Sequence, residues 1–251
     1  MKDNKKIYGL TGHPLTHSFS KDFFNTKFQK EKINAEYRNF DIDDISHLPG
    51  LLQTNKTICG LNVTIPYKQQ VMHILDETDP TAAKIGAVNV IKIIRDKDGK
   101  AKTKGYNSDI FGFRESLRPL LGDHQRNALV LGTGGASKAV AFVLEELGIG
   151  FEYVSRTKGT GRITYQDLTE DIIKSHTLIV NTTPLGMYPD ITGYPAIPYQ
   201  YITKRHLCFD LIYNPEETLF LKYSKEHGAS IKNGMEMLEL QALEAWRIWN
   251  T

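Results

Sequence analysis

A chain of 251 residues, 40% of them apolar, is long enough to bury one large core or two modest ones. Its net charge is +2 and no basic segment is interleaved with aromatic residues, so the composition gives no reason to expect nucleic acid or an anionic membrane as a partner. No stretch approaches transmembrane length, and no apolar signal-peptide region precedes the first predicted strand. We therefore expect a cytoplasmic protein.

Strand-like and helix-like segments alternate from one end of the chain to the other, which predicts an α/β fold. Phe19, Phe23 and Phe28 form an apolar stripe that predicts core packing for the first helix. The strands of the first half, including a hairpin turned at Asp98 and Gly99, are expected within residues 7–10, 35–40, 57–63 and 87–106.

Lys68 and Asp109 are the first candidates for chemistry. Pro66 ends the apolar strand over residues 57–63, which reads as a buried parallel strand, and Lys68 opens the next segment. Open α/β sheets bind ligands where the carboxyl ends of parallel strands meet, so this position favours ligand contact. Asp109 precedes an amphipathic run, and a helix N-cap is the alternative role for it.

The second half begins with a strand, a glycine-rich turn and a helix in that order. The strand covers residues 127–131, the turn follows at residues 132–137, and the helix is expected over residues 138–147. In this arrangement backbone N–H groups at a helix N-terminus can meet a pyrophosphate, and the glycines permit its close approach. The pattern predicts nucleotide binding.

The end of the next strand, near residue 154, indicates which dinucleotide binds. A site selective for NAD usually places a carboxylate there for the ribose hydroxyls. This chain has Ser155, Arg156 and Thr157 instead, and a guanidinium can hold a 2′-phosphate. The sequence therefore favours NADP, with a solvated turn as the alternative role for Arg156.

Two later segments, residues 179–187 and 207–215, each read as a strand that ends in a polar turn. Their shared location at strand ends favours ligand contact for Asn181 and Asp210, with local Asx turns as the alternative. Cys59 and Cys208 lie in apolar runs and are expected to be buried reduced thiols. No cysteine or histidine spacing indicates a metal site.

Seven ordered motifs together resemble those of the shikimate dehydrogenase family, whose members reduce 3-dehydroshikimate in aromatic biosynthesis. The resemblance runs nearly end to end. The motifs occupy residues 12–20, 62–68, 86–89, 105–109, 132–136, 181–187 and 233–242.

The resemblance implies a role for each matching residue. Lys68 and Asp109 would form the catalytic pair. The ligands would be shikimate or 3-dehydroshikimate and NADP, and the chain would be a monomer or a homodimer. The substrate contacts would be Ser18 and Ser20 on the carboxylate, Thr64, Asn89 and Gln241 on the ring hydroxyls, and Tyr213. The cofactor contacts would be Gly132, Thr133, Gly134, Gly135, Ala136, Ser155, Arg156, Thr157, Asn181, Thr182, Met187 and Gly234.

The same resemblance implies two α/β domains with a cleft between them. Residues 1–108 and 232–251 would form the substrate domain, and residues 109–231 a Rossmann-type NADP domain. The helix over residues 234–249 would return to the substrate domain, with Met235, Leu238, Ala242, Ala245 and Trp249 at helical spacing for core packing.

The chain departs from the family pattern at a few positions. Lys21 stands where Pro is common, and Ser108 and Val90 stand where Thr is common. Ser108 keeps the hydroxyl. Lys21 adds a cation near an anionic substrate, or begins a helix in solvent. The chain is also short around residues 158–164, near the expected 2′-phosphate site.

Three other functions compete with this interpretation. A quinate or dual quinate/shikimate dehydrogenase would keep the catalytic pair, but Ser20 and Arg156 argue against it. Another Rossmann oxidoreductase, of the short-chain or methylene-tetrahydrofolate type, would carry Tyr-x-x-x-Lys, and no tyrosine here has a lysine four residues later. A non-catalytic nucleotide sensor would give no reason for Lys68 and Asp109 to stand in intact motifs.

Overall fold

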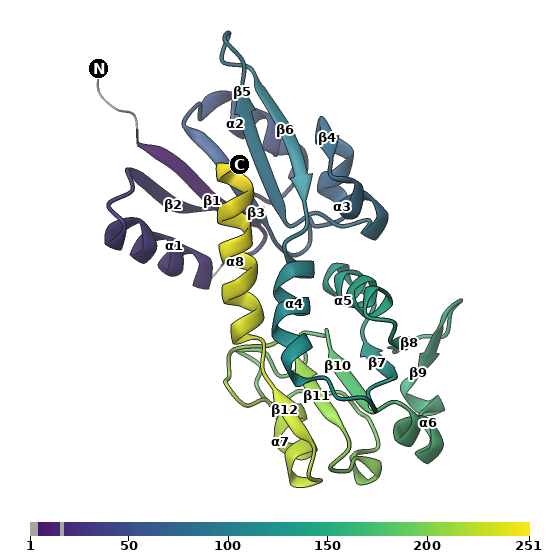
Figure 1. Ribbon diagram of the computed structural model, residues 1–251. Coiled ribbons are helices and arrows are strands. Elements are labelled where there is room, and N and C mark those ends of the chain that lie inside the picture. The colour runs from purple at the N-terminus through teal and green to yellow at the C-terminus, as the bar shows by residue number, and fades with distance from the viewer. Residues whose placement is uncertain (1–4, 16–17) are drawn as a thin grey trace. The chain divides into compact units, whose positions relative to one another are not determined.

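The computed structural model describes residues 5–15 and 18–251, so Thr16 and His17 of the first motif lie outside the described residues. The chain divides into two compact units, Met1–Ser108 with Ala242–Thr251, and Asp109–Gln241. The helix α8 (Met235–Asn250, yellow in Figure 1) therefore belongs to both. This division differs from the sequence-based one, because residues 232–241 fall in the second unit.

The first unit is built on a six-stranded mixed sheet in the order β2-β1-β3-β5-β6-β4. Its strands are β1 (Lys6–Gly12), β2 (Ala35–Asp41), β3 (Ile58–Val63), β4 (Glu77–Thr78), β5 (Val90–Arg95) and β6 (Ala101–Tyr106). The prediction of a parallel strand over residues 57–63 is correct toward β1 and wrong toward β5, which runs antiparallel to β3. The hairpin partner β6 is antiparallel to β5 in turn.

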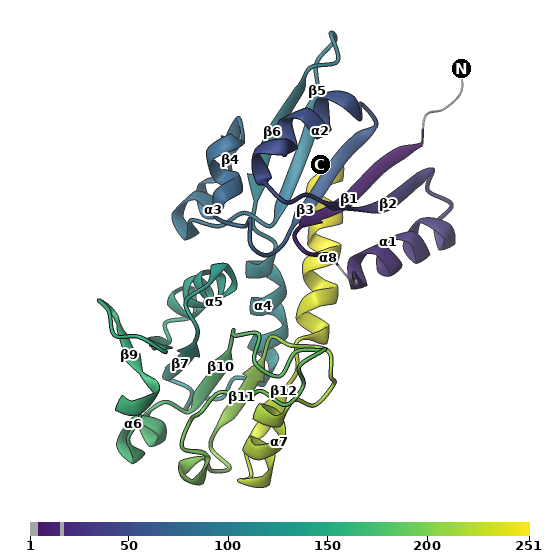
Figure 2. The same cartoon turned by 180° about the vertical axis from the view of Figure 1, so that it is seen from behind.

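Each face of this sheet has its own core. One core joins the sheet to α2 (Leu48–Thr54) through Leu48, Leu52 and Leu61. The other joins it to α1 (Phe19–Lys30) and to the last turns of α8. Figures 1 and 2 show α2 and α8 on opposite sides of the strands. The short helix α3 (Pro80–Ile85) follows β4.

The apolar stripe of α1 is rotated from the predicted one. Phe24 and Phe28 are its buried aromatic residues, while Phe23 is only partly buried against the same core. The pair at positions 24 and 28 is separated by one helical turn and lies on one face. The prediction was correct for Phe28, but Phe24 rather than Phe19 or Phe23 completes the buried stripe.

The second unit is built on a six-stranded parallel sheet in the order β12-β11-β10-β7-β8-β9. Its strands are β7 (Asn127–Leu131), β8 (Gly150–Ser155), β9 (Arg162–Thr164), β10 (Leu178–Asn181), β11 (Leu207–Asp210) and β12 (Ser230–Lys232). Read from β9, this is the strand order 3-2-1-4-5-6 of a doubly wound dinucleotide-binding fold. The order reverses between β7 and β10.

Helices cover both faces of the second sheet. On one face, α6 (Glu170–Ser175) and α7 (Leu219–Glu226) contribute Ile173 and Phe220 to a core that includes Cys208. On the other, Phe113 of α4 (Asp109–Leu117) packs edge-on against Phe209 at 5.2 Å. Cys208 is buried as expected, whereas Cys59 is only half-buried, and both thiols are free. Among the described residues, no helix combines the length and apolarity needed to cross a membrane.

Trp249 fixes the end of α8 to the first sheet. Its Nε1 donates to the Ile91 carbonyl at 3.1 Å, and its ring lies 4.9 Å from that of Tyr8. A Cβ atom at Gly60 would come within 2.4 Å of the indole. Only glycine leaves room for the ring on this strand.

We predict that Gly60→Ala lowers the free energy of unfolding of the first unit by about 1–3 kcal/mol, because the added methyl overpacks the indole site. Both tryptophans of the chain, Trp246 and Trp249, belong to that unit, so their fluorescence in a urea titration measures it. Gly50→Ala is the control, because this helical position has no atom within 4 Å of the new methyl. There we expect a gain of about 0.5–1 kcal/mol. A Gly60→Ala protein as stable as the wild type would contradict the packing argument.

Candidate functional site

The turn after β3 holds Thr64 and Lys68 next to the loop that carries Asn89. The Val88 N–H donates to the Lys68 carbonyl at 2.7 Å, and the Val63 N–H donates to the Asn89 carbonyl at 2.8 Å. Thr64 bonds the end of β1, since its N–H donates to the Thr11 carbonyl at 2.9 Å. Lys68 itself is half-buried. The structure therefore brings Thr64, Lys68 and Asn89 together at the ends of β1 and β3.

Asn89 is buried and joins two loops of the first unit. Its Oδ1 accepts from the Ser108 N–H at 2.7 Å, and its Nδ2 donates to the Ser108 hydroxyl at 3.1 Å. Ser108, where the family pattern has Thr, uses its hydroxyl in this contact. The amide of Asn89 thus fixes the chain at the residue before Asp109.

Ser18 and Ser20 lie at the start of α1. Ser18 is the N-cap, and its Oγ accepts from the Lys21 N–H at 3.2 Å. Lys21 therefore begins a helix, and its side chain is exposed. Ser20 is buried.

Asp109 and Gln241 are the first and last residues of the second unit, and both are buried. Asp109 opens α4, and Gln241 lies in α8, where its Nε2 donates to the Leu238 carbonyl at 3.0 Å. Gly112, one turn after Asp109, would place a Cβ 3.0 Å from that of Gln241. The two helices therefore meet beside these residues.

The glycine-rich loop joins β7 to α5 (Gly135–Glu146), which begins three residues earlier than predicted. Gly132 has φ +109°, and its N–H donates to the Val154 carbonyl at 2.9 Å. Gly134 is the N-cap of α5 and supplies no side chain, so no side chain caps the first N–H groups of the helix there. A Cβ at Gly134 would have no neighbour within 4 Å. This end of α5 has the backbone donors and the room that a phosphate group needs.

The end of β8 carries Ser155, Arg156 and Thr157. Ser155 is buried, and its hydroxyl donates to the Thr157 carbonyl at 2.5 Å and accepts from the Thr157 N–H at 3.2 Å. These bonds form a tight turn that leaves Arg156 exposed. The guanidinium is therefore available to an anionic group at this strand end.

The loop after β10 is bonded to the strands on both sides. Asn181, fully buried, donates to Asp210 Oδ1 at 3.0 Å, and its own Oδ1 accepts from the Thr183 N–H and hydroxyl at 3.0 and 2.7 Å. The Thr182 hydroxyl donates to the Leu131 carbonyl at 2.7 Å. Met187 is exposed. This loop lies at the reversal point of strand order, next to the glycine-rich loop.

Asp210 is the ionisable group that holds this edge of the second sheet. Its carboxylate also accepts from the Ile212 N–H at 3.0 Å and from the Thr218 hydroxyl at 2.6 Å. Burial raises the pKa of Asp210 from 3.8 to about 7, although these hydrogen bonds act in the opposite direction. The Asx turn considered from the sequence is present at both residues, since the Thr183 N–H bonds Asn181 and the Ile212 N–H bonds Asp210. Neither predicted role includes Thr218, which lies eight residues after Asp210.

Gly234 and Tyr213 lie beside the same edge. The Gly234 N–H donates to the Ile212 carbonyl at 2.9 Å, and a Cβ there would meet the Leu211 carbonyl oxygen at 2.0 Å. Tyr213 is half-buried, and burial raises the pKa of its phenol. The second unit thus brings together the predicted cofactor residues of the glycine-rich loop, the β10 loop and Gly234.

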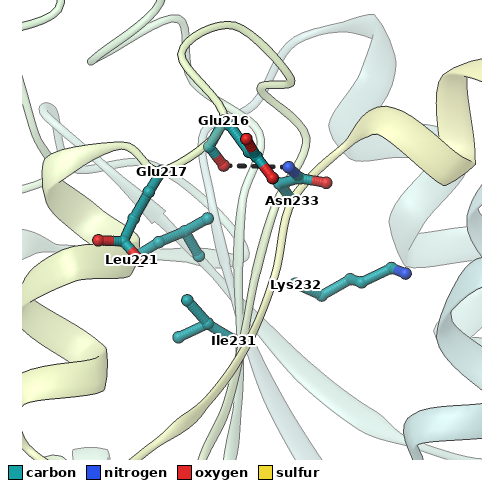
Figure 3. Close-up of a pocket in the computed structure, with 6 residues that line it drawn as sticks. All are labelled: Glu216, Glu217, Leu221, Ile231, Lys232 and Asn233. Carbon is teal, nitrogen blue, oxygen red and sulfur yellow. Dashed lines mark hydrogen bonds between the residues drawn. The ribbon is translucent and has the colours of Figure 1, made fainter.

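A hollow of about 500 Å³ in the second unit adjoins the segment that carries Gly234, since Asn233 is one of its lining residues. Glu216, Glu217 and Lys232 line it together with Leu221, Ile231 and Asn233, and the Asn233 amide donates to the Glu216 carbonyl at 3.0 Å (Figure 3). The Lys232 side chain extends away from Glu217. The two carboxylates would repel an anionic ligand. Among the described residues, no cluster of histidine, cysteine and acidic side chains could hold a metal ion.

Comparison with known proteins gives consistent matches. A sequence model of the shikimate dehydrogenase substrate binding domain matches residues 10–91. The shikimate dehydrogenase (NADP(+)) of Methanococcus vannielii is 39% identical over 271 residues, which cover 99% of this chain and 93% of the relative.

Solved structures agree with this match. A shikimate dehydrogenase in complex with NADP+ is 35% identical, with a TM-score of 0.84 and coverage of 98% of this chain and 90% of that chain. Shikimate 5-dehydrogenase from Thermus thermophilus, in complex with NADP(H) and shikimate, is 30% identical, with a TM-score of 0.83 and coverage of 97% and 93%.

We predict that Asp210 makes the stability of the second unit depend on pH. Its pKa is higher in the folded protein than in the unfolded chain, so the stability it contributes is complete below about pH 4 and is lost as the pH rises through about 7. The loss amounts to up to about 4 kcal/mol. Urea unfolding followed by circular dichroism between pH 4 and 8 measures it.

Asp210→Asn should remove this pH dependence, since the amide can accept from Asn181 and Ile212 while Thr218 reverses its hydrogen bond. Asp123→Asn changes an exposed carboxyl of the same unit and serves as the control. Parallel pH profiles for the wild type and Asp210→Asn would contradict the assignment.

Proposed function

This chain belongs to the shikimate dehydrogenase family, and on that premise we propose that it catalyses the reversible, NADPH-dependent reduction of 3-dehydroshikimate to shikimate. The observation that carries the proposal is the turn after β3, where the Lys68 carbonyl accepts from Val88 and holds the lysine beside Asn89. A protein that only bound a nucleotide would have no use for a lysine at this place.

The second unit fits NADP. The glycine-rich loop leads to the uncapped start of α5 and would bind the pyrophosphate through Gly132, Thr133, Gly134, Gly135 and Ala136. Arg156, between Ser155 and Thr157, would bind the 2′-phosphate. Asn181 would act here mainly by shaping the loop of Thr182 and Met187, because its amide is bonded to Asp210 and Thr183. Gly234, which has no side chain, would let the backbone approach the cofactor closely.

Lys68 would supply the proton of the reaction. When bound, the nicotinamide supplies a hydride to the C3 carbon during reduction. The ketone oxygen then needs one proton, and the Lys68 ammonium would donate it. Asp109 would hold the ammonium in place and contact the same hydroxyl, and the reverse direction returns the proton to the lysine.

The first unit would recognise the rest of the substrate. Ser18 and Ser20 at the start of α1 would bind the carboxylate, and the positive end of the helix would favour its charge. Thr64 and Asn89 would bind ring hydroxyls, together with Gln241 and Tyr213 of the second unit. The same proposal makes the first unit the substrate domain and the second unit the NADP domain. It also includes a cytoplasmic location and a monomeric or homodimeric state.

The direct test is cofactor reduction by the purified protein, followed by absorbance, with shikimate or quinate against NADP⁺ or NAD⁺. We expect fast turnover only with shikimate and NADP⁺. Turnover of quinate would favour the quinate or dual quinate/shikimate dehydrogenase instead. Silence in every combination would overturn the proposed function.

We predict that Lys68→Met folds as the wild type does and lowers kcat by roughly 10²–10⁴, the effect of losing a general acid/base. The backbone bond from Val88 does not depend on the side chain, so the turn should be kept. Lys97→Met, at an exposed position of the hairpin turn, is the matched control. Wild-type turnover in Lys68→Met would remove the lysine from the mechanism.

We predict that Gly134→Ala raises the KM for NADP⁺ about tenfold without a loss of stability. The methyl has room in the protein alone, and the backbone at φ −82° and ψ −170° accepts alanine. It would, however, occupy the space of a bound phosphate, and 1.4 kcal/mol of lost affinity is about tenfold. Gly132→Ala should instead destabilise the protein, since its φ is +109° and its Cβ would meet Thr182 Oγ1 at 2.7 Å. An unchanged KM for NADP⁺ in Gly134→Ala would place the phosphates elsewhere.

A further inference from the structure

Tyr37, which the sequence analysis did not single out, belongs to a buried chain of hydrogen bonds in the first unit. Its side chain is 1% exposed, and its hydroxyl donates to Asn62 Oδ1 at 2.8 Å. The phenol oxygen therefore joins β2 to β3, although β1 lies between these two strands.

The chain of hydrogen bonds continues from Asn62 to the residue before Asp109. Asn62 Nδ2 donates to the Asn89 carbonyl at 3.3 Å, and Asn89 Oδ1 accepts from the Ser108 N–H at 2.7 Å. Every side chain in this path is buried. The path therefore runs from Tyr37 to an asparagine assigned to a ring hydroxyl.

Tyr37 also anchors α1 as a whole. Asn25 of that helix bonds both backbone groups of Tyr37, accepting from its N–H at 2.9 Å and donating to its carbonyl at 3.0 Å. The ring of Phe24 stacks on the phenol ring at a centroid distance of 4.8 Å and an interplanar angle of 11°. The helix lies along β2 in both views (Figures 1 and 2). These contacts hold α1, whose first turn carries Ser20, to the residue whose hydroxyl bonds Asn62.

We infer that Tyr37 is a positioning residue for substrate binding, which holds α1 and its serines in a fixed place relative to Asn62 and Asn89. A single rigid substrate can bind its carboxylate and its ring hydroxyls together only if that spacing is held. The inference rests on the proposed function. Phenylalanine at this position would keep the stack on Phe24, but it would leave Asn62 Oδ1 without its donor.

Tyr37→Phe should raise the KM for shikimate about 3- to 10-fold, the effect of one lost buried hydrogen bond. The KM for NADP⁺ and kcat should stay within about twofold of the wild-type values, because the substitution removes no contact assigned to the cofactor or to proton transfer. A tenfold change would need a loss of 1.4 kcal/mol. Tyr199→Phe is the control. It also removes one tyrosine hydrogen bond, to the Pro195 carbonyl at 2.8 Å, but in the second unit and away from the path. Its KM for shikimate should equal that of the wild type.

A second variant separates positioning from general loosening of the fold. If Tyr37 acts through Asn62, then Tyr37→Phe should raise the KM for shikimate less in an Asn62→Ala protein than in the wild type, since the partner is already gone. If the two substitutions instead raise the KM for shikimate by independent factors that multiply, the inference is overturned. A melting temperature lowered equally by Tyr37→Phe and Tyr199→Phe, with no change in either KM, would also overturn it.

The outcomes distinguish this inference from the proposed function. An active wild type whose KM for shikimate does not respond to Tyr37→Phe refutes the positioning role alone. A wild type that does not turn over shikimate refutes the proposed function, and the positioning role falls with it.

Discussion

The contact of Trp249 with Gly60 is the constraint on which the chain's organisation depends. The indole occupies the space that any side chain at Gly60 would need, and its N–H bonds the Ile91 carbonyl. The last turns of α8 therefore complete a core of the first unit, which otherwise ends at Ser108. Along the sequence, residues Asp109–Gln241 are therefore inserted between the two segments that form the first unit.

Both units use buried amides at strand ends to join loops that are distant in sequence. Asn89 in the first unit bonds the backbone and hydroxyl of Ser108, and Asn181 in the second bonds Asp210 and Thr183. A buried polar group left without a partner costs about 1–3 kcal/mol, so such bonds resist rearrangement. The side chains that face ligand can then be carried by loops and still keep fixed positions.

Much of the fold can be predicted from the local sequence pattern. The features that cannot be predicted depend on the register of strands or on which face of a helix is buried. The strand, glycine turn and helix of the second unit were predictable because each step needs particular residues, with only the first turn of α5 missed. Phe24 was missed because a helical stripe shifts by 100° with each residue. The pairing of Tyr37 with Asn62 depends on the order and register of three strands, which composition does not carry. The burial of Asp210 depends on Thr218 and Asn181, and an aspartate is usually exposed.

The second unit also has neighbouring ends. Asp109 opens α4 and Gln241 lies in α8, and the two helices come so close at Gly112 that a Cβ there would be 2.5 Å from the Met237 carbonyl oxygen. A segment with adjacent ends can pass between genes by recombination as one block, without rethreading the chain that receives it. The first unit lacks this freedom. During synthesis on the ribosome, the core that Trp249 fills is complete only when the last turns of α8 have emerged, after the whole inserted block.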